Sequence, residues 1–98
     1  METRTLTDGS ESFEITVAGS LTAARVVLFA VGAGGNPARQ HAPLLAELAA
    51  RGCAVVAPHF ERLPLAPTED DLLLRARRSR LALDAVARPG IPVAGVGH

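Results

Sequence analysis

Three short segments hold the residue types that could do chemistry, and each follows an apolar run. A glycine cluster, Gly32–Gly35, comes directly after the run Val26–Val31. Pro58–Glu61 and Gly97–His98 follow two further apolar runs. Glycines let the backbone turn sharply and expose N–H groups that can stabilise a bound oxyanion. The glycine cluster therefore indicates either an oxyanion-binding loop or simply a tight connection from a strand to a helix.

The other reactive side chains have simpler interpretations. His41 is expected to face solvent just before a helix, and His59 is interpreted as a loop residue at a strand end that faces the candidate site. Cys53 is the only cysteine, and it opens an apolar run, which is typical of an inert thiol in the core.

The apolar runs predict the strands that position these segments. Three runs are continuously apolar, as expected for strands covered on both faces, whereas Glu11–Ala18 alternates apolar and polar residues and predicts a strand with one solvent-exposed face. A weaker strand is expected at Arg4–Thr7, joined to Glu11–Ala18 by a turn at Asp8 and Gly9. The continuously apolar runs are Val26–Val31, Cys53–Ala57 and Ile91–Val96.

Two helical patterns separate the last three strands. The first has Pro43 in its opening turn and ends at Arg51 and Gly52, and the second begins after Thr68, a good N-cap residue, and ends at Arg88–Gly90. The apolar positions expected to face the core are Leu44, Leu45 and Leu48 in the first helix and Leu72, Ala76, Ser79, Leu83 and Val86 in the second.

The second helix also contains a cluster of arginines. We interpret this cluster as a solvated face, with Asp71 pairing with Arg75 and Asp84 pairing with Arg88 four residues further on. The cluster consists of Arg75, Arg77, Arg78 and Arg80.

Alternation of strands and helices in the second half predicts a single α/β domain over residues 1–98, with three layers and a mostly parallel sheet of about five strands. We expect Val26–Val31 in the middle, between Cys53–Ala57 and Ile91–Val96. Ligands bind such sheets at the carboxyl ends of the strands, so Gly32–Gly35 and Gly97–His98 are expected to converge.

In the order of these elements, the chain resembles the α/β-hydrolase superfamily, and most closely its dienelactone-hydrolase-like members. The resemblance rests on an apolar strand that ends in Gly32–Gly35, on Ala54–Pro58, and on a strand that ends in Gly97–His98. It covers the whole chain but only about the first half of a hydrolase domain. It also implies that the Glu11–Ala18 strand lies antiparallel beside Cys53–Ala57.

The resemblance implies roles for the loop residues. Ala33 would donate one N–H to the oxyanion hole, and the neighbouring Gly34 is the alternative donor. Gly32 and Gly35 would flank these two residues in the oxyanion loop. Gly97 and His98 match the first two positions of the nucleophile elbow G-x-S-x-G. Val31 departs from the family pattern, because many members have His at this position. A valine side chain cannot form the hydrogen bonds by which such a His would support the oxyanion hole.

The same resemblance implies that the catalytic residues themselves are missing. The nucleophilic Ser is expected immediately after His98, and the acid and the histidine of the triad come later in the family. We therefore expect the N-terminal half of a serine hydrolase of ester, lactone or related acyl substrates, without a cofactor or metal and inactive as given. An apolar Ile91–Val96 strand that lacks its neighbour would also favour self-association through its edge.

Two alternatives are a Rossmann-like nucleotide-binding domain and a non-catalytic α/β module. The glycine cluster resembles G-x-G-x-x-G, but Pro37 stands at the third glycine position, and Asn36–Pro37 is expected to delay the start of a helix. Pro58 and His59 stand where that fold has an acidic residue.

Composition points away from several partner classes. Ten acidic residues balance ten arginines, so nothing indicates binding to nucleic acid or to an anionic membrane. The first residues do not form a signal peptide, and the longest apolar run is too short to span a bilayer. With a single cysteine, these features predict a soluble, cytoplasmic protein.

Overall fold

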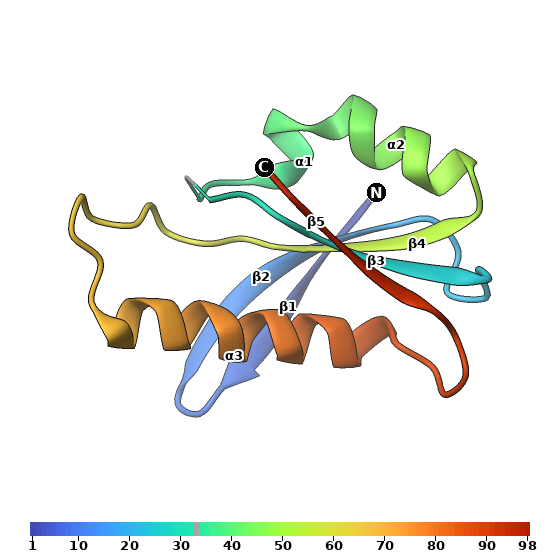
Figure 1. Ribbon diagram of the computed structural model, residues 1–98. Coiled ribbons are helices and arrows are strands. Elements are labelled where there is room, and N and C mark those ends of the chain that lie inside the picture. The colour runs from blue at the N-terminus through green and yellow to red at the C-terminus, as the bar shows by residue number, and fades with distance from the viewer. Residues whose placement is uncertain (33) are drawn as a thin grey trace.

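The computed structural model describes residues 1–32 and 34–98 (Figure 1). Its strands are β1 (Glu2–Asp8), β2 (Glu11–Ala18), β3 (Arg25–Ala30), β4 (Cys53–Pro58) and β5 (Val93–Gly97). Its helices are α1 (Pro37–Gln40), α2 (Ala42–Ala50) and α3 (Glu69–Val86). The predicted strands and the two predicted helices are all present, and α1 is an additional short helix.

The strands form one sheet in the order β1-β2-β4-β3-β5. β3 pairs in parallel with β4 on one edge and with β5 on the other, which confirms the predicted middle position of Val26–Val31. β2 lies antiparallel beside β4, as the resemblance implied.

The expectation of a mostly parallel sheet is wrong, because the sheet is mixed. β1 and β2 are antiparallel, from Glu2 opposite Val17 to Asp8 opposite Glu11, and β2 is antiparallel to β4. A tight turn can only join antiparallel strands, whereas parallel strands need a long crossover connection. The short turn between Asp8 and Glu11 therefore dictates the antiparallel hairpin.

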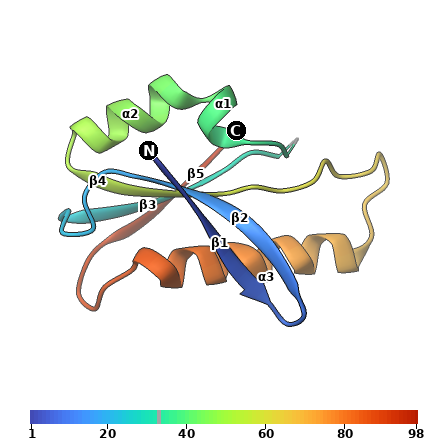
Figure 2. The same ribbon diagram turned by 180° about the vertical axis from the view of Figure 1, so that it is seen from behind.

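Helices cover both faces of the sheet, which gives three layers (Figures 1 and 2). On one face, Leu45 of α2 packs in a cluster with Phe29 and Val55. On the other face, Ala82 and Val86 of α3 pack in a cluster with strand residues such as Ile15 and Val56. β3 and β4 contribute side chains to both clusters, as expected for strands that are covered on two faces.

The face of β2 that was predicted to be exposed to solvent is partly buried. Phe13, Ile15 and Val17 are buried as expected, and Glu14 is exposed, but Thr16 is only 1% exposed. The Thr16 hydroxyl lies 2.6 Å from Nε2 of His59, so the buried hydroxyl has a hydrogen-bond partner, as a buried polar group requires.

In α2, Pro43 occupies one of the first two helical positions, as predicted. Leu45 is fully buried and Leu48 packs against the same cluster, but Leu44 is 40% exposed. Only part of the predicted apolar stripe therefore faces the sheet.

α3 begins as predicted, but only the last part of its predicted apolar stripe faces the sheet. Thr68 forms a capping box with Asp71, in which the Thr68 hydroxyl accepts from the Asp71 N–H and the Asp71 carboxylate accepts from the Thr68 N–H. Leu72 is 52% exposed and Ala76 is also exposed. Val86 is buried and Leu83 packs against the core cluster, as predicted. The other inward positions of the helix, Leu74, Arg78 and Ala82, lie outside the predicted stripe.

The interpretation of the α3 arginines as a solvated face is wrong for Arg75 and Arg78. The Arg78 side chain is only 12% exposed, and its guanidinium lies 5.2 Å from the ring centroid of Phe13. The two predicted ion pairs are not formed either. Asp71 caps the helix, and Asp84 pairs with Arg80 at 3.1 Å.

β5 pairs with β3 but is exposed along its whole length, contrary to the expectation of a strand covered on both faces. Val93 is 48% exposed and Val96 is 36% exposed. β5 is the last strand of the sheet, so one of its edges has no neighbouring strand among the described residues.

We therefore predict that the 98-residue chain self-associates through β5, because an exposed apolar edge is a template for strand pairing. Val96→Lys should shift the chain toward monomer, whereas Leu44→Lys, on an exposed position of α2, should leave association unchanged. Light scattering over a concentration series measures the difference. A strictly monomeric wild-type chain at high concentration would contradict this prediction.

An ionic cluster holds the β1–β2 hairpin against α3. Arg77 donates to both carboxylate oxygens of Asp8, at 2.7 and 2.8 Å, and Arg78 donates to the same carboxylate at 2.9 Å. Arg78 also donates to Glu11 at 3.2 Å. The Asp8 side chain is only 8% exposed, and the hydrogen bonds from Arg77 and then Arg78 lower its pKa from 3.8 to about 2.

We predict that Asp8→Asn lowers the melting temperature near neutral pH, because the carboxylate is charged in both states at that pH but is paired with two arginines only in the folded state. A depressed folded-state pKa stabilises the fold above the unfolded pKa, and this contribution is lost as pH falls from about 4 toward about 2. Thermal melts of the two proteins should therefore converge near pH 2.

The matched control for this prediction is Asp84→Asn, which removes an exposed carboxylate paired with one arginine of the same helix. Exposed pairs of this kind contribute little, so the control should melt close to the wild type at every pH. A pH-independent difference between Asp8→Asn and wild type would contradict the account of Asp8.

Candidate functional site

The loops after β3 and β5 meet at one end of the sheet. The Gly32 N–H donates to the His98 carbonyl at 2.8 Å, and the His98 N–H donates to the Ala30 carbonyl at 2.9 Å. These two bonds extend the β3–β5 ladder beyond both strands. The predicted convergence of Gly32–Gly35 and Gly97–His98 is therefore confirmed for Gly32 and His98, and Figure 1 shows the chain end beside the loop that leads to α1.

The glycine loop is closed by its own hydrogen bonds. The Gly34 N–H donates to the Val31 carbonyl at 3.1 Å, and the Gly35 N–H donates to the Phe60 carbonyl at 2.7 Å. The second bond joins the loop after β3 to the segment after β4. The Gly34 N–H, one of the two candidate oxyanion donors, is thus already used inside the loop, while the other candidate, Ala33, lies outside the described residues.

Gly34 occupies a backbone position that only glycine fits. Its φ is +84°, and a Cβ placed there would lie 2.7 Å from the Phe60 carbonyl oxygen and 2.8 Å from that of Glu61. The missing side chain therefore lets the loop lie directly against the backbone that follows β4.

The glycine loop passes straight into α1, contrary to the expectation that Asn36 and Pro37 delay a helix. The Asn36 side chain accepts a hydrogen bond from the Ala38 N–H at 2.9 Å, and Pro37 opens the helix. Asn is a favoured N-cap residue, and proline suits the first helical position because its missing N–H would have no partner there. From the sequence, Asn36 and Pro37 are interpreted together as delaying a helix, which misses the ability of Asn36 to cap one.

Arg75 of α3 reaches across to this end of the sheet and was not identified as a site residue from the sequence. Its Nη1 donates to the carbonyls of Gly32 at 2.9 Å and Val31 at 3.3 Å, and its Nη2 donates to the Glu61 carbonyl at 2.7 Å. The guanidinium carbon lies 4.8 Å from the ring centroid of Phe60. Burial lowers the pKa of Arg75, which still remains charged because arginine is not deprotonated in proteins.

His41 is not simply solvent-facing, which corrects the expectation for this residue. It is half-buried at the junction of α1 and α2. Its ring lies 5.4 Å from that of Phe29 and 4.4 Å from that of His98, centroid to centroid. His41 thus links the buried face of β3 to the end of β5.

His59 lies just beyond β4 and is tied to β2. Its N–H donates to the Glu14 carbonyl at 2.9 Å, and its Nε2 lies 2.6 Å from the Thr16 hydroxyl. Burial lowers its pKa, and the charge of Glu14 opposes this shift. These contacts give His59 a structural role at the strand end, in line with its interpretation as a loop residue.

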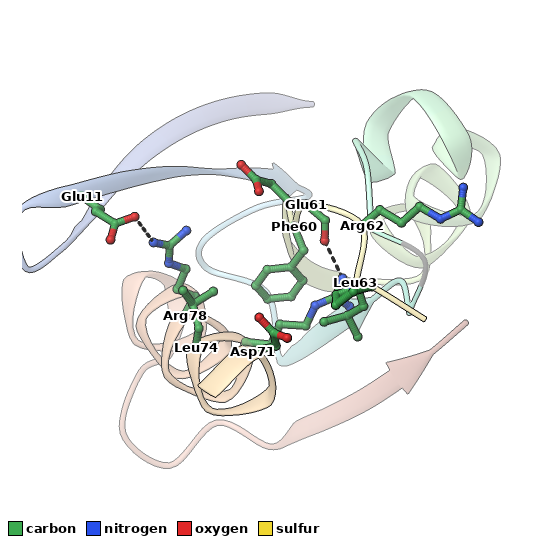
Figure 3. Close-up of a pocket in the computed structure, with 10 residues that line it drawn as sticks. Glu11, Phe60, Glu61, Arg62, Leu63, Asp71, Leu74 and Arg78 are labelled. Carbon is green, nitrogen blue, oxygen red and sulfur yellow. Dashed lines mark hydrogen bonds and ion pairs between the residues drawn. The ribbon is translucent and has the colours of Figure 1, made fainter. Parts of the chain in front are cut away.

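Two hollows flank the segment that follows β4. One, of about 570 Å³, is lined by Gly34, Gly35, Gln40 and Phe60–Arg62. The other, of about 270 Å³, lies on the α3 side and includes Arg75 and Arg78 (Figure 3). In Figure 3 the Phe60 ring points toward α3, whereas the Arg62 side chain points away from the pocket. The glycine loop therefore borders the larger of these two open hollows.

Among the described residues, no Ser, Thr or Cys side chain lines these two hollows. Cys53 is buried at the start of β4, the opposite end from Pro58. In the described part of the chain, no group of three or more His, Cys, Asp or Glu side chains could hold a metal ion. None of the helices described is long and apolar enough to cross a membrane. The serines lie in the β1–β2 hairpin, after β2 and in α3, at Ser10, Ser12, Ser20 and Ser79.

Comparison with known proteins finds a solved structure with a similar fold. No protein-family model matches the chain, and no curated protein matches it. The fold is similar to a solved structure titled "Thioesterase Domain From Curacin Biosynthetic Pathway", with a TM-score of 0.71 and 28% sequence identity. That neighbour has an α/β-hydrolase-type fold. The match covers 100% of this chain and 37% of the neighbour, so the chain spans little more than a third of the neighbour's length.

We predict that Gly34→Ala destabilises the glycine loop and the fold around it. A left-handed alanine costs about 1–2 kcal/mol, and overpacking against the Phe60 and Glu61 carbonyls adds about 1–3 kcal/mol. Gly90→Ala is the matched control, since Gly90 has a φ of +78° but nothing within 4 Å of the added Cβ. Denaturant unfolding should show a clearly larger loss for Gly34→Ala, and equal losses would contradict the close contact.

Proposed function

We propose that residues 1–98 form the N-terminal portion of a serine hydrolase that cleaves ester, lactone or thioester bonds. The dienelactone-hydrolase-like resemblance and the thioesterase neighbour both favour acyl substrates. The observation that carries the proposal is the meeting of the glycine loop with the end of β5, where the Gly32 N–H bonds to the His98 carbonyl.

The proposed chemistry depends on the charge that an acyl hydrolase must stabilise. Attack on an ester or thioester carbonyl places negative charge on its oxygen, and preorganised N–H groups lower the barrier by binding that oxyanion. In this fold, one N–H comes from the loop after β3, and the other comes from the residue that follows the nucleophile at the end of β5. The contact between Gly32 and His98 brings these two regions together.

Within the loop, we assign the oxyanion donor to Ala33. The N–H groups of Gly32, Gly34 and Gly35 all donate to carbonyls of this chain, so they are not free for a substrate oxygen. Gly97 and His98 are assigned to the opening of the nucleophile elbow, with a serine as the next residue of the complete enzyme. His98 is then a spacer in the elbow and not the catalytic base.

The nucleotide-binding alternative gains no support from the loop. Phosphate binding in that fold uses free backbone N–H groups at the start of a helix. Here α1 has only four residues, and the Gly34 and Gly35 N–H groups point at carbonyls of this chain. The acidic residue of that fold is also replaced by Pro58 and His59 at the end of β4.

The proposal predicts that the 98-residue chain does not turn over acyl substrates, because residues 1–32 and 34–98 place no Ser or Cys nucleophile beside a base at the glycine loop. Hydrolysis of a p-nitrophenyl ester and of an acyl thioester should stay at the background rate. A fluorophosphonate probe should label none of the four serines. Specific labelling of one of them would contradict the assignment of the nucleophile to the position after His98.

The sharper test of the proposal is the codon that comes after that of His98 in the gene. A serine codon, continuing as G-H-S-x-G, supports the elbow at the end of β5. A stop codon or a residue that cannot act as a nucleophile contradicts the proposal directly, whatever the assays on the 98-residue chain show.

A further inference from the structure

We propose that His59 and Thr16 form a pH-sensitive latch, which holds the segment after β4 against β2 while His59 is neutral and releases it when His59 is protonated. The segment comprises residues 59–61, and its last two residues line the larger hollow beside the glycine loop. The latch therefore controls how firmly one wall of that hollow is held. This inference does not depend on the proposed function, because it concerns hydrogen bonds of the fold and not a reaction.

Two contacts join the segment to β2. Nε2 of His59 lies 2.6 Å from the Thr16 hydroxyl, and the His59 N–H donates to the Glu14 carbonyl at 2.9 Å. Thr16 is only 1% exposed, so solvent has little access to its hydroxyl. In residues 1–32 and 34–98, His59 is the one side chain that bonds to this hydroxyl. The buried hydroxyl therefore depends on the imidazole for its partner.

The hydrogen-bonding capacity of an imidazole makes this contact sensitive to pH. A neutral imidazole has one acceptor nitrogen, which can accept from a hydroxyl, whereas a protonated imidazole carries two N–H donors and no acceptor. Protonation of His59 would therefore leave the proton of the Thr16 hydroxyl without an acceptor. A buried polar group without a partner is costly, and a partly buried charge adds to that cost. Opening the contact to water relieves both.

Three charged side chains surround His59. Glu14 of β2, Glu61 of the same segment and Arg78 of α3 line an open hollow of about 340 Å³ together with His59, so solvent protons can reach the imidazole. Burial lowers the pKa of His59, and the negative charge of Glu14 opposes this shift. A lowered folded-state pKa means that the latch stabilises the fold fully above about pH 6.5, and that this contribution is lost as pH falls through the folded-state value.

Release of His59 affects the glycine loop through the next two residues. The Phe60 carbonyl accepts from the Gly35 N–H at 2.7 Å, and the Glu61 carbonyl accepts from Arg75 at 2.7 Å. The Phe60 ring points toward α3 (Figure 3), while the contacts of His59 are with β2. The segment is thus held from two sides, and loss of the β2 side loosens the bond from Gly35.

The experiment measures amide hydrogen exchange by NMR in the 98-residue chain between about pH 7.5 and about pH 5, a range that spans the titration of a histidine. Protection factors are compared, because they remove the pH dependence of intrinsic exchange. Protection of the His59 and Gly35 amides should fall about tenfold, the order expected for losing a hydrogen bond of a buried group. The fall should share its midpoint with the shifts of the His59 ring protons. The Val55 amide, in the buried part of β4, should keep its protection.

Three variants separate the latch from other effects of pH. His59→Gln does not titrate but can still accept from a hydroxyl, so protection should stay high at both pH values. His41→Gln is the matched control, since it removes another histidine close to the chain end at His98, and the pH dependence should persist. Thr16→Val removes the hydroxyl with little change of shape, so protection at about pH 7.5 should already be as low as in the acidified wild type.

Several results would overturn the proposal. Equal wild-type protection at both pH values, or an equal fall at Val55, contradicts the latch even if a variant does not fold. Full pH dependence in His59→Gln, or its loss in His41→Gln, contradicts the assignment to His59. None of these readouts involves turnover or the codon after His98, so the hydrolase proposal and the latch can fail separately.

Discussion

The pairing of β3 on both of its edges governs the arrangement of the whole chain. β4 and β5 both run parallel to it, and parallel neighbours end at the same edge of a sheet. The segments after all three strands are therefore brought to one place, where Gly32 bonds to His98 and Gly35 bonds to Phe60. The helices are a consequence of this pairing, because each parallel connection must cross one face of the sheet.

The arginines of α3 then tie peripheral segments to this centre. Arg77 and Arg78 bind Asp8 at the tip of the β1–β2 hairpin, and Arg75 binds the carbonyls of the two loops at the strand ends. One helix thus anchors both the antiparallel hairpin and the candidate site. Its contribution depends on charged donors as well as on apolar packing, since only Ala82 and Val86 are fully buried on it.

Much of the fold could be predicted from the sequence, because continuous apolar runs, glycine turns and a Thr68 cap are local signals. The errors arose where a partner distant in sequence decides the outcome. In the sequence, Arg75 and Arg78 resemble part of a solvated helix face, because Asp8 and the loop carbonyls that bind them are distant in the chain. The spacing of Leu74, Arg78, Ala82 and Val86 by four residues is a signal that would have indicated the inward side of the helix. For the site, the convergence of Gly32 with His98 could be predicted from parallel pairing alone. The hydrogen bond from the Gly34 N–H to the Val31 carbonyl and the contact of His41 with Phe29 could not be predicted from residue spacing, because they depend on the three-dimensional path of the loops.

The most direct test of the central claim is thioesterase activity in a chimera in which residues 1–98 replace the matched 37% of the thioesterase neighbour. The part of the neighbour that lies outside the match completes the chimera, and a fragment of the neighbour that lacks the replaced part serves as the control. If this chain provides a working oxyanion loop and elbow opening, the chimera hydrolyses the neighbour's thioester substrate above that control. A folded chimera with no activity above the control would contradict the claim.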